Sequence, residues 1–234
     1  MTRPTTAWSL LMAHQRRIRR LRWRIAVGSC ATLSALSLSP ERGEAQWRLA
    51  TTPRVGAFVP TTTLGPWLTA SARTGPGVAL GVTSEAVRRE RIGLRAELDA
   101  ALGAGPHVQS DDCSRSCGRE NTYAGAVVLA VGDVSVPLHS GARARLDLVF
   151  GGGMKAYLFP AMGSSCGPTD DVCAATLQFT RNRADPTVHA AASLRRRAGR
   201  RHVVFELGDY VSRYDGGRVQ HDLLVTVGIR GRAP

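Results

Sequence analysis

Apolar and polar positions alternate with a period of two in several separate segments of the chain. Between Ile92 and Ala100 every second side chain is apolar, and those between are glycine or charged. The segment near the end repeats the pattern, its apolar face being formed by Leu223, Val225, Val227 and Ile229. Successive side chains of a strand point to opposite faces, so the alternation predicts β-strands with one face free of charge.

The same pattern predicts eight strands, at 53–60, 77–84, 91–102, 122–134, 143–158, 187–196, 201–211 and 219–230. Long connections at 61–76, 103–121 and 159–186 alternate with short ones at 85–90, 135–142 and 197–200, and only the last connection, 212–218, is shorter than this rhythm requires. Outer-membrane barrels combine short periplasmic turns with longer external loops. The sequence therefore predicts an all-β fold, an up-and-down, eight-stranded antiparallel transmembrane β-barrel.

The start of the chain has the form of a signal peptide. Its first 24 residues hold seven arginines, and a charge-free run from Ile25 to Pro40 follows. That run is too short to cross ~30 Å of hydrocarbon as a helix, while Gly43 and Ala45 supply the small residues of a cleavage site. We expect residues 1–45 to be a signal peptide, residues 46–234 to be the barrel domain, and the protein to reach the outer membrane through the periplasm.

The positive charge of the chain gathers in this leader. The whole chain carries a net +13, but residues 1–45 hold eight Arg against two Glu, which leaves +7 for the rest. Nucleic acid is therefore not an expected partner.

The polar face of the strands mixes charged residues with many small ones. Eight strands enclose an interior just wide enough for side chains to fill, so these charges are expected to pair in the lumen and leave no open pore. The predicted interior charges are Arg95, Glu97, Asp99, Arg145, Asp147, Lys155, His189, Arg195, Glu206, Asp222 and Arg230. The structural alternative is a soluble β-barrel that buries the apolar face as its core.

Aromatic residues occur at or near the expected external strand ends. Outer-membrane barrels carry such residues as an interfacial girdle. The sequence therefore predicts a girdle made of Trp67, Tyr123, Tyr157, Phe159, Tyr210 and Tyr214.

The segment from Phe150 to Tyr157, with its run Gly151-Gly152-Gly153, resembles strands of the OmpA/OmpX-type small outer-membrane barrels. The resemblance covers the region after the leader by architecture, and it implies a barrel class that includes lipid A acyltransferases and deacylases. The best catalytic set is His189, Ser193 and Glu206. His189 and Ser193 are four residues apart on one strand, roughly 13 Å, too far for a hydrogen bond of ~2.6–3.2 Å. No catalysis is expected.

Four cysteines follow the leader, in two close pairs, Cys113 with Cys117 and Cys166 with Cys173. Both pairs fall in predicted long loops, and export favours disulfides. A zinc site is the alternative, although its usual Cys-x-x-Cys spacing is missing. Four cysteines allow three pairings, so the connectivity stays open.

Two charge clusters remain. Arg195-Arg196-Arg197 with Arg200 and Arg201 lies at a short turn, where it would hold phospholipid headgroups or an acidic periplasmic partner, or be a solvated turn. Asp111-Asp112 and Asp170-Asp171 could bind a hard cation, but paired Asp residues are a weak signal, and neither a cofactor nor a metal is expected.

The function predicted from the sequence is a structural or surface-interaction scaffold. The protein would lie in outer-membrane lipid as a monomer and meet an extracellular or cell-envelope partner through the loops 103–121 and 159–186. Small-solute transport and, less favoured, lipid modification are the alternatives.

Overall fold

The computed structural model of the chain describes residues 48–67, 70–88, 92–110, 120–159, 173, 182–214 and 218–231. The predicted signal peptide lies outside these ranges. Within them, no helix is long and apolar enough to cross a membrane.

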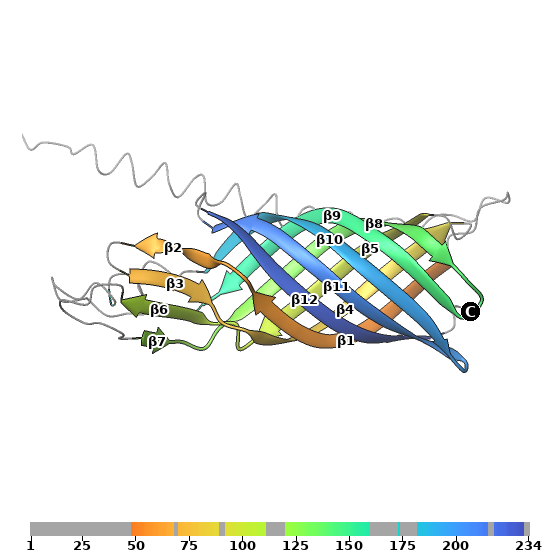
Figure 1. Ribbon diagram of the computed structural model, residues 1–234, viewed down its shortest axis with the longest axis horizontal. Helices are drawn as coiled ribbons and strands as arrows, with labels where there is room; N and C mark the ends of the chain where they lie inside the picture. Colours follow the sequence, from red (N-terminus) through yellow and green to blue (C-terminus); the bar gives the residue numbers. More distant parts are fainter. Residues whose placement is uncertain are drawn as a thin grey trace, which may run out of the picture. The chain divides into compact units, whose positions relative to one another are not determined.

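Eight strands close into one antiparallel barrel, in the order β1-β12-β11-β10-β9-β8-β5-β4, as Figure 1 shows. The barrel closes because β1 pairs with β12 along one edge and with β4 along the other. The predicted fold class is therefore confirmed. The barrel strands are β1 Arg48–Pro60, β4 Gly77–Arg88, β5 Ile92–Leu102, β8 Ala126–Ser140, β9 Ala144–Leu158, β10 Arg183–Ala198, β11 Arg201–Arg213 and β12 Val219–Arg230.

The short connections are tighter than the sequence pattern indicates. β10 and β11 stay paired up to Ala198 and Arg201, which leaves two residues for the turn. The first of these, Gly199, has a φ of 61°, a conformation that glycine adopts without the steric penalty of a side chain. The predicted connection 135–142 was likewise too long, because β8 continues to Ser140.

Two of the predicted long connections contain a second sheet, which the sequence pattern missed. Strands β2 Thr63–Trp67 and β3 Ala70–Thr74 lie within 61–76, and β6 Pro106–Ser110 and β7 Glu120–Thr122 follow β5. They form a four-stranded sheet in the order β2-β3-β6-β7 (Figure 1). These strands have three to five residues each, too few to show a clear alternation, and their pairing joins segments that are distant in the chain.

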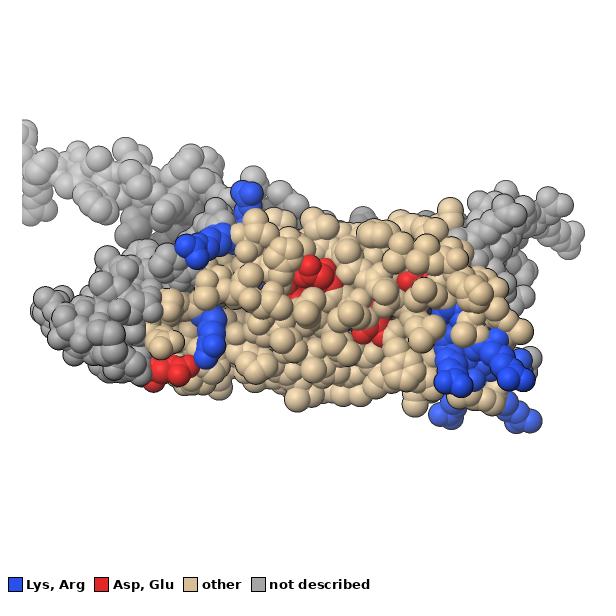
Figure 2. Space-filling model, in the orientation of Figure 1, with Lys and Arg blue, Asp and Glu red and all other residues tan. Residues whose placement is uncertain are grey.

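The barrel is apolar outside and polar inside. On β5, for example, Leu94 and Leu98 are about half exposed on the outward face, while Arg95, Glu97 and Asp99 point inward and are buried. Figure 2 shows basic side chains gathered toward the ends of the barrel, while the side between them is mostly uncharged apart from a few acidic patches. Such a polarity suits a barrel surrounded by lipid and argues against a soluble one with a buried apolar face.

Asp209 and His221 depart from this pattern. They belong to outward-facing positions of the neighbouring strands β11 and β12, and an Asp209 carboxylate oxygen lies 2.8 Å from Nδ1 of His221.

The expected aromatic girdle is wrong for four of its members. Tyr157, Phe159, Tyr210 and Tyr214 are buried. Tyr157 contacts Phe159 and Tyr214 edge to face, with ring centroids 5.4 Å and 5.1 Å apart. Tyr157 and Tyr210 occupy inward positions of their strands, so their rings point away from lipid.

These rings belong to an apolar cluster that continues into the second sheet. Leu64 of β2, Ala72 of β3 and Val108 of β6 share it with Phe58 and other inward residues of the barrel. The inner face of the second sheet is therefore packed, and the sheet is fixed by the same core as this end of the barrel.

The outward face predicts a depth-dependent penalty for charge. Leu207 is half exposed near the middle of β11. We expect Leu207→Arg to lower the free energy of unfolding by ~2–4 kcal/mol, compared with ~0–1 kcal/mol for the same change near the interface. Val219→Arg, at the start of β12, is the matched control. Denaturant unfolding in lipid vesicles measures both, and equal costs would show that the outer face does not meet hydrocarbon.

Candidate functional site

The inward face of the barrel holds a column of charged side chains. Of the predicted interior charges, nine are buried and two, Arg145 and Arg195, are partly buried at one end of the column. The buried ones are Arg95, Glu97, Asp99, Asp147, Lys155, His189, Glu206, Asp222 and Arg230. The same interior also holds Arg54, Glu85, Asp133 and Asp185.

Arg54 is the most connected side chain of this column. Its Nε donates to Asp99 at 2.8 Å, its Nη2 donates to Glu97 at 2.6 Å, and its Nη1 donates to Glu206 at 2.7 Å. These acceptors belong to β5 and β11, which are each separated from β1 by one intervening strand. One guanidinium group therefore ties three parts of the barrel wall together through the lumen.

Arg95 completes the central group. Its Nη2 donates to Glu206 at 2.5 Å and also forms an ion pair with Glu97. The Tyr210 hydroxyl donates to Glu97 at 3.3 Å. Buried charges are costly unless each is paired and hydrogen-bonded, and the two fork-shaped guanidinium groups supply several donors to the carboxylates around them.

Two further groups lie on either side of this centre. Toward the short turns, Glu85 accepts from Arg195 at 2.7 Å and also pairs with Arg230. Toward the second sheet, Lys155 pairs with Asp222. The lumen is thus closed by three successive sets of ion pairs.

Little space is left among these side chains. A cavity of about 20 Å³ is lined by residues that include Arg54, Glu85, Arg95, Glu206 and Arg230. A single water needs roughly 10–15 Å³ of such volume. This cavity, which lies among described residues, can therefore hold water but is too small for a larger solute.

The structure brings Glu206 close to both His189 and Ser193, but it does not join His189 to Ser193. Within the described residues, Nδ1 of His189 lies 3.1 Å from Asp133, and the imidazole stacks on Tyr210 with centroids 4.2 Å apart. Ser193 is buried and is the register partner of Asp147 and Glu206, one strand to either side. His189 lies four residues before Ser193 on β10, and no hydrogen bond joins these two described side chains.

Asp133 and Glu85 are interior residues that the sequence analysis missed. Asp133 lies on the inward face of β8 with Val127, Leu129 and Val131, so its alternation was the available signal. Glu85 fell in a predicted turn, but β4 continues to Arg88 and carries it into the lumen. The end of a strand decides which charges belong to the interior. The sequence pattern ended this strand at residue 84, so Glu85 was not counted among the interior charges.

The basic cluster lies at the end where β10 and β11 are joined. Arg196, Arg197, Arg200 and Arg201 are exposed there, and Arg143 in the neighbouring turn is exposed beside them. The backbone N–H of Arg197 donates to the carbonyl of Arg143 at 2.9 Å. Figure 2 shows basic side chains gathered at this end.

Of the four cysteines after the leader, only Cys173 lies within the described residues. Cys173 is disulfide-bonded, whereas Cys113, Cys117 and Cys166 lie outside the described residues. The pairing therefore stays a prediction. Asp111, Asp112, Asp170 and Asp171 also lie outside the described residues.

The fold and its polarity define a class. A closed eight-stranded antiparallel barrel with a paired charged lumen and an apolar outer face is a transmembrane β-barrel of the small outer-membrane type. The architecture that the OmpA/OmpX resemblance implies is therefore present.

Solved structures with a similar fold include the following three. Ail, the attachment invasion locus protein of Yersinia pestis, is 10% identical over 78% of this chain and 99% of its own, with a TM-score of 0.44. Neisserial surface protein A is 8% identical over 81% and 99%, with a TM-score of 0.48. The N-terminal β-barrel domain of Pseudomonas aeruginosa OprF is 9% identical over 79% and 99%, with a TM-score of 0.43.

No protein-family model and no curated protein sequence matches the chain. At these identities the structural likeness concerns the fold and does not carry a function.

The central ion pairs predict a large loss of stability when one partner is removed. Arg54→Ala leaves three buried carboxylates without their shared cation, so we expect a cost of ~3–5 kcal/mol. Arg73→Ala removes an exposed pair with Glu120 and should cost ~0–1 kcal/mol. Unfolding in lipid vesicles compares the two, and an Arg54→Ala cost no larger than that of Arg73→Ala would contradict the role of Arg54.

Proposed function

We propose that this chain is an outer-membrane anchor that presents a fixed interaction surface outside the cell and performs no catalysis. The observation that carries the proposal is the filled lumen, in which ion pairs occupy the interior from one end to the other. A barrel sealed in this way is suited to hold its loops in the membrane, and it offers no passage for a solute.

The second sheet supports the surface role. Its inner face packs into the apolar cluster, while its other side carries paired polar groups. Arg73 lies 3.5 Å from Glu120, and His107 lies 3.2 Å from Glu120 and 3.0 Å from the Thr122 hydroxyl. A packed sheet holds such groups in a defined arrangement, which lowers the entropy lost when a partner binds.

The proposal includes an orientation. Short turns of outer-membrane barrels face the periplasm, and the basic cluster at the β10–β11 turn suits the anionic headgroups found at a membrane surface. The second sheet, at the opposite end of the strands, then faces outward. It includes part of the loop 103–121 that the sequence favoured, whereas most of the loop 159–186 lies outside the described residues.

Cysteine labelling in intact cells tests the orientation. Gln109→Cys places a thiol on the exposed part of β6, and Arg200→Cys places one at the short turn. A membrane-impermeant maleimide should label Gln109→Cys in intact cells and Arg200→Cys only after lysis, with the unsubstituted chain giving the background. The reverse pattern would put the second sheet in the periplasm and contradict the surface role.

A flux assay separates the anchor from the transport alternative. Liposomes that contain the folded protein should release a small trapped solute no faster than empty ones, because the lumen holds a cavity of only about 20 Å³. Solute release above that of empty liposomes would favour a channel.

A further inference from the structure

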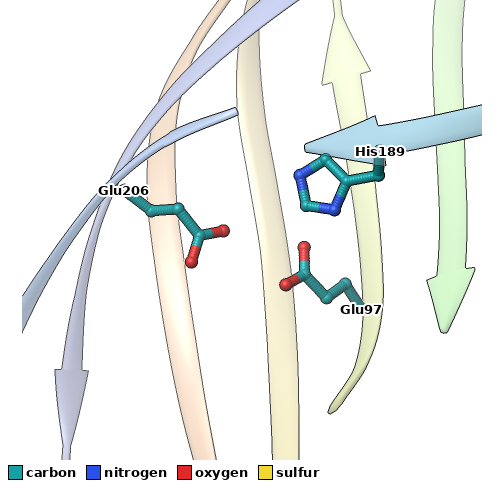
Figure 3. Close-up of side chains that lie close together, drawn as sticks. All are labelled: Glu97, His189 and Glu206. Atoms are coloured by element: carbon teal, nitrogen blue, oxygen red, sulfur yellow. The ribbon is translucent and has the colours of Figure 1, made fainter. Parts of the chain in front are cut away.

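Three side chains with metal-binding atoms meet inside the barrel. Glu97 of β5, His189 of β10 and Glu206 of β11 each place one such atom so that all three atoms lie within 4.8 Å of one another. The exposed fractions of these residues are 3%, 0% and 6%. Figure 3 shows the imidazole ring and the two carboxylates turned toward a common space.

The charge around this space is unbalanced. Two guanidinium groups, those of Arg54 and Arg95, contact the carboxylates of Glu97, Asp99 and Glu206. The fourth buried carboxylate of the group, Asp133, pairs with His189 instead. Four carboxylates thus face two fixed cations, and the buried group carries an excess of two negative charges while His189 is neutral. Uncompensated buried charge is costly, so a further cation is favoured here.

His189 has the arrangement of a metal-ligating histidine. Its Nδ1 is 3.1 Å from an Asp133 carboxylate oxygen, which fixes the proton on that nitrogen when the ring is neutral. Its Nε2 is buried and has no hydrogen-bond partner. In many metal sites a carboxylate accepts a hydrogen bond from one ring N–H of a histidine, and the lone pair of the other ring nitrogen binds the metal. The missing partner is the observation that points to a ligand.

We propose that Glu97, His189 and Glu206 bind a divalent transition-metal cation of the zinc type within the lumen. One imidazole nitrogen with carboxylate oxygens is a donor set that zinc accepts, and a charge of +2 offsets the excess negative charge. Each carboxylate oxygen has two lone pairs, so Glu97 and Glu206 can coordinate and still accept from Arg54 and Arg95. Coordination distances of ~2.0–2.2 Å require the three side chains to move closer together.

The site is independent of the anchor role. A bound cation would link β5 to β10 and β11 across the lumen, in addition to the links that Arg54 makes from β1. The folded protein should therefore unfold at a higher temperature with zinc than without it, while the exposed sheet and its partner are unaffected.

Metal content of the folded full-length chain tests the proposal. The protein is folded into detergent micelles with zinc, free metal is removed, and zinc is counted per chain. The unsubstituted chain and the control His139→Gln, which alters an exposed histidine near the short turn, should retain a single ion. His189→Gln should lose it, and the rise in unfolding temperature with zinc should disappear with it.

A second measurement does not depend on a variant that folds. X-ray absorption at the zinc edge of the unsubstituted protein should show one nitrogen among light-atom ligands and no sulfur. Absence of retained zinc, retention by folded His189→Gln equal to that of the unsubstituted chain, or sulfur ligation from the loop cysteines would each overturn the proposal.

Discussion

Barrel closure is the constraint on which the rest of this structure depends. Backbone N–H and C=O groups in hydrocarbon must be satisfied within the protein, and a sheet achieves this only by pairing its first strand with its last. Here β1 pairs with both β4 and β12. Once the sheet is closed around eight strands, every second residue must lie in a narrow interior, and the side chains there must satisfy one another because bulk water is excluded.

The ion pairs of the lumen follow from that confinement. Arg54 reaches Glu97, Asp99 and Glu206 because inward side chains of strands two places apart meet in the lumen of so narrow a barrel. The same compactness accounts for the minimal cavity. It also leaves His189, held by Asp133 and Tyr210, with one nitrogen that no neighbour satisfies. The sealed lumen supports an anchor, while the excess negative charge at its centre supports a cation site.

The two ends of the barrel differ in chemistry. One end has tight turns and exposed arginines, including Arg197 and Arg200. The other has an apolar cluster around Tyr157 that extends into a second sheet. The outward face of the membrane-spanning part is mostly apolar, and the proposed interaction surface lies on strands that the apolar core supports.

The sequence by itself determined the strand periodicity, the eight barrel strands and the inward position of residues such as Glu97, Lys155 and Glu206, because in a strand the face of a residue follows from its parity. It did not determine which charges meet. Arg54 and Glu206 are 152 positions apart, and only the closed topology brings them within 2.7 Å. The second sheet could not be predicted from the sequence pattern either, because its short strands depend on pairing between distant segments and on the core beneath them. Tyr157 and Tyr210 were assigned to a girdle for their chemistry, although they share the strand parity of Lys155 and Glu206, and in the structure both rings point inward.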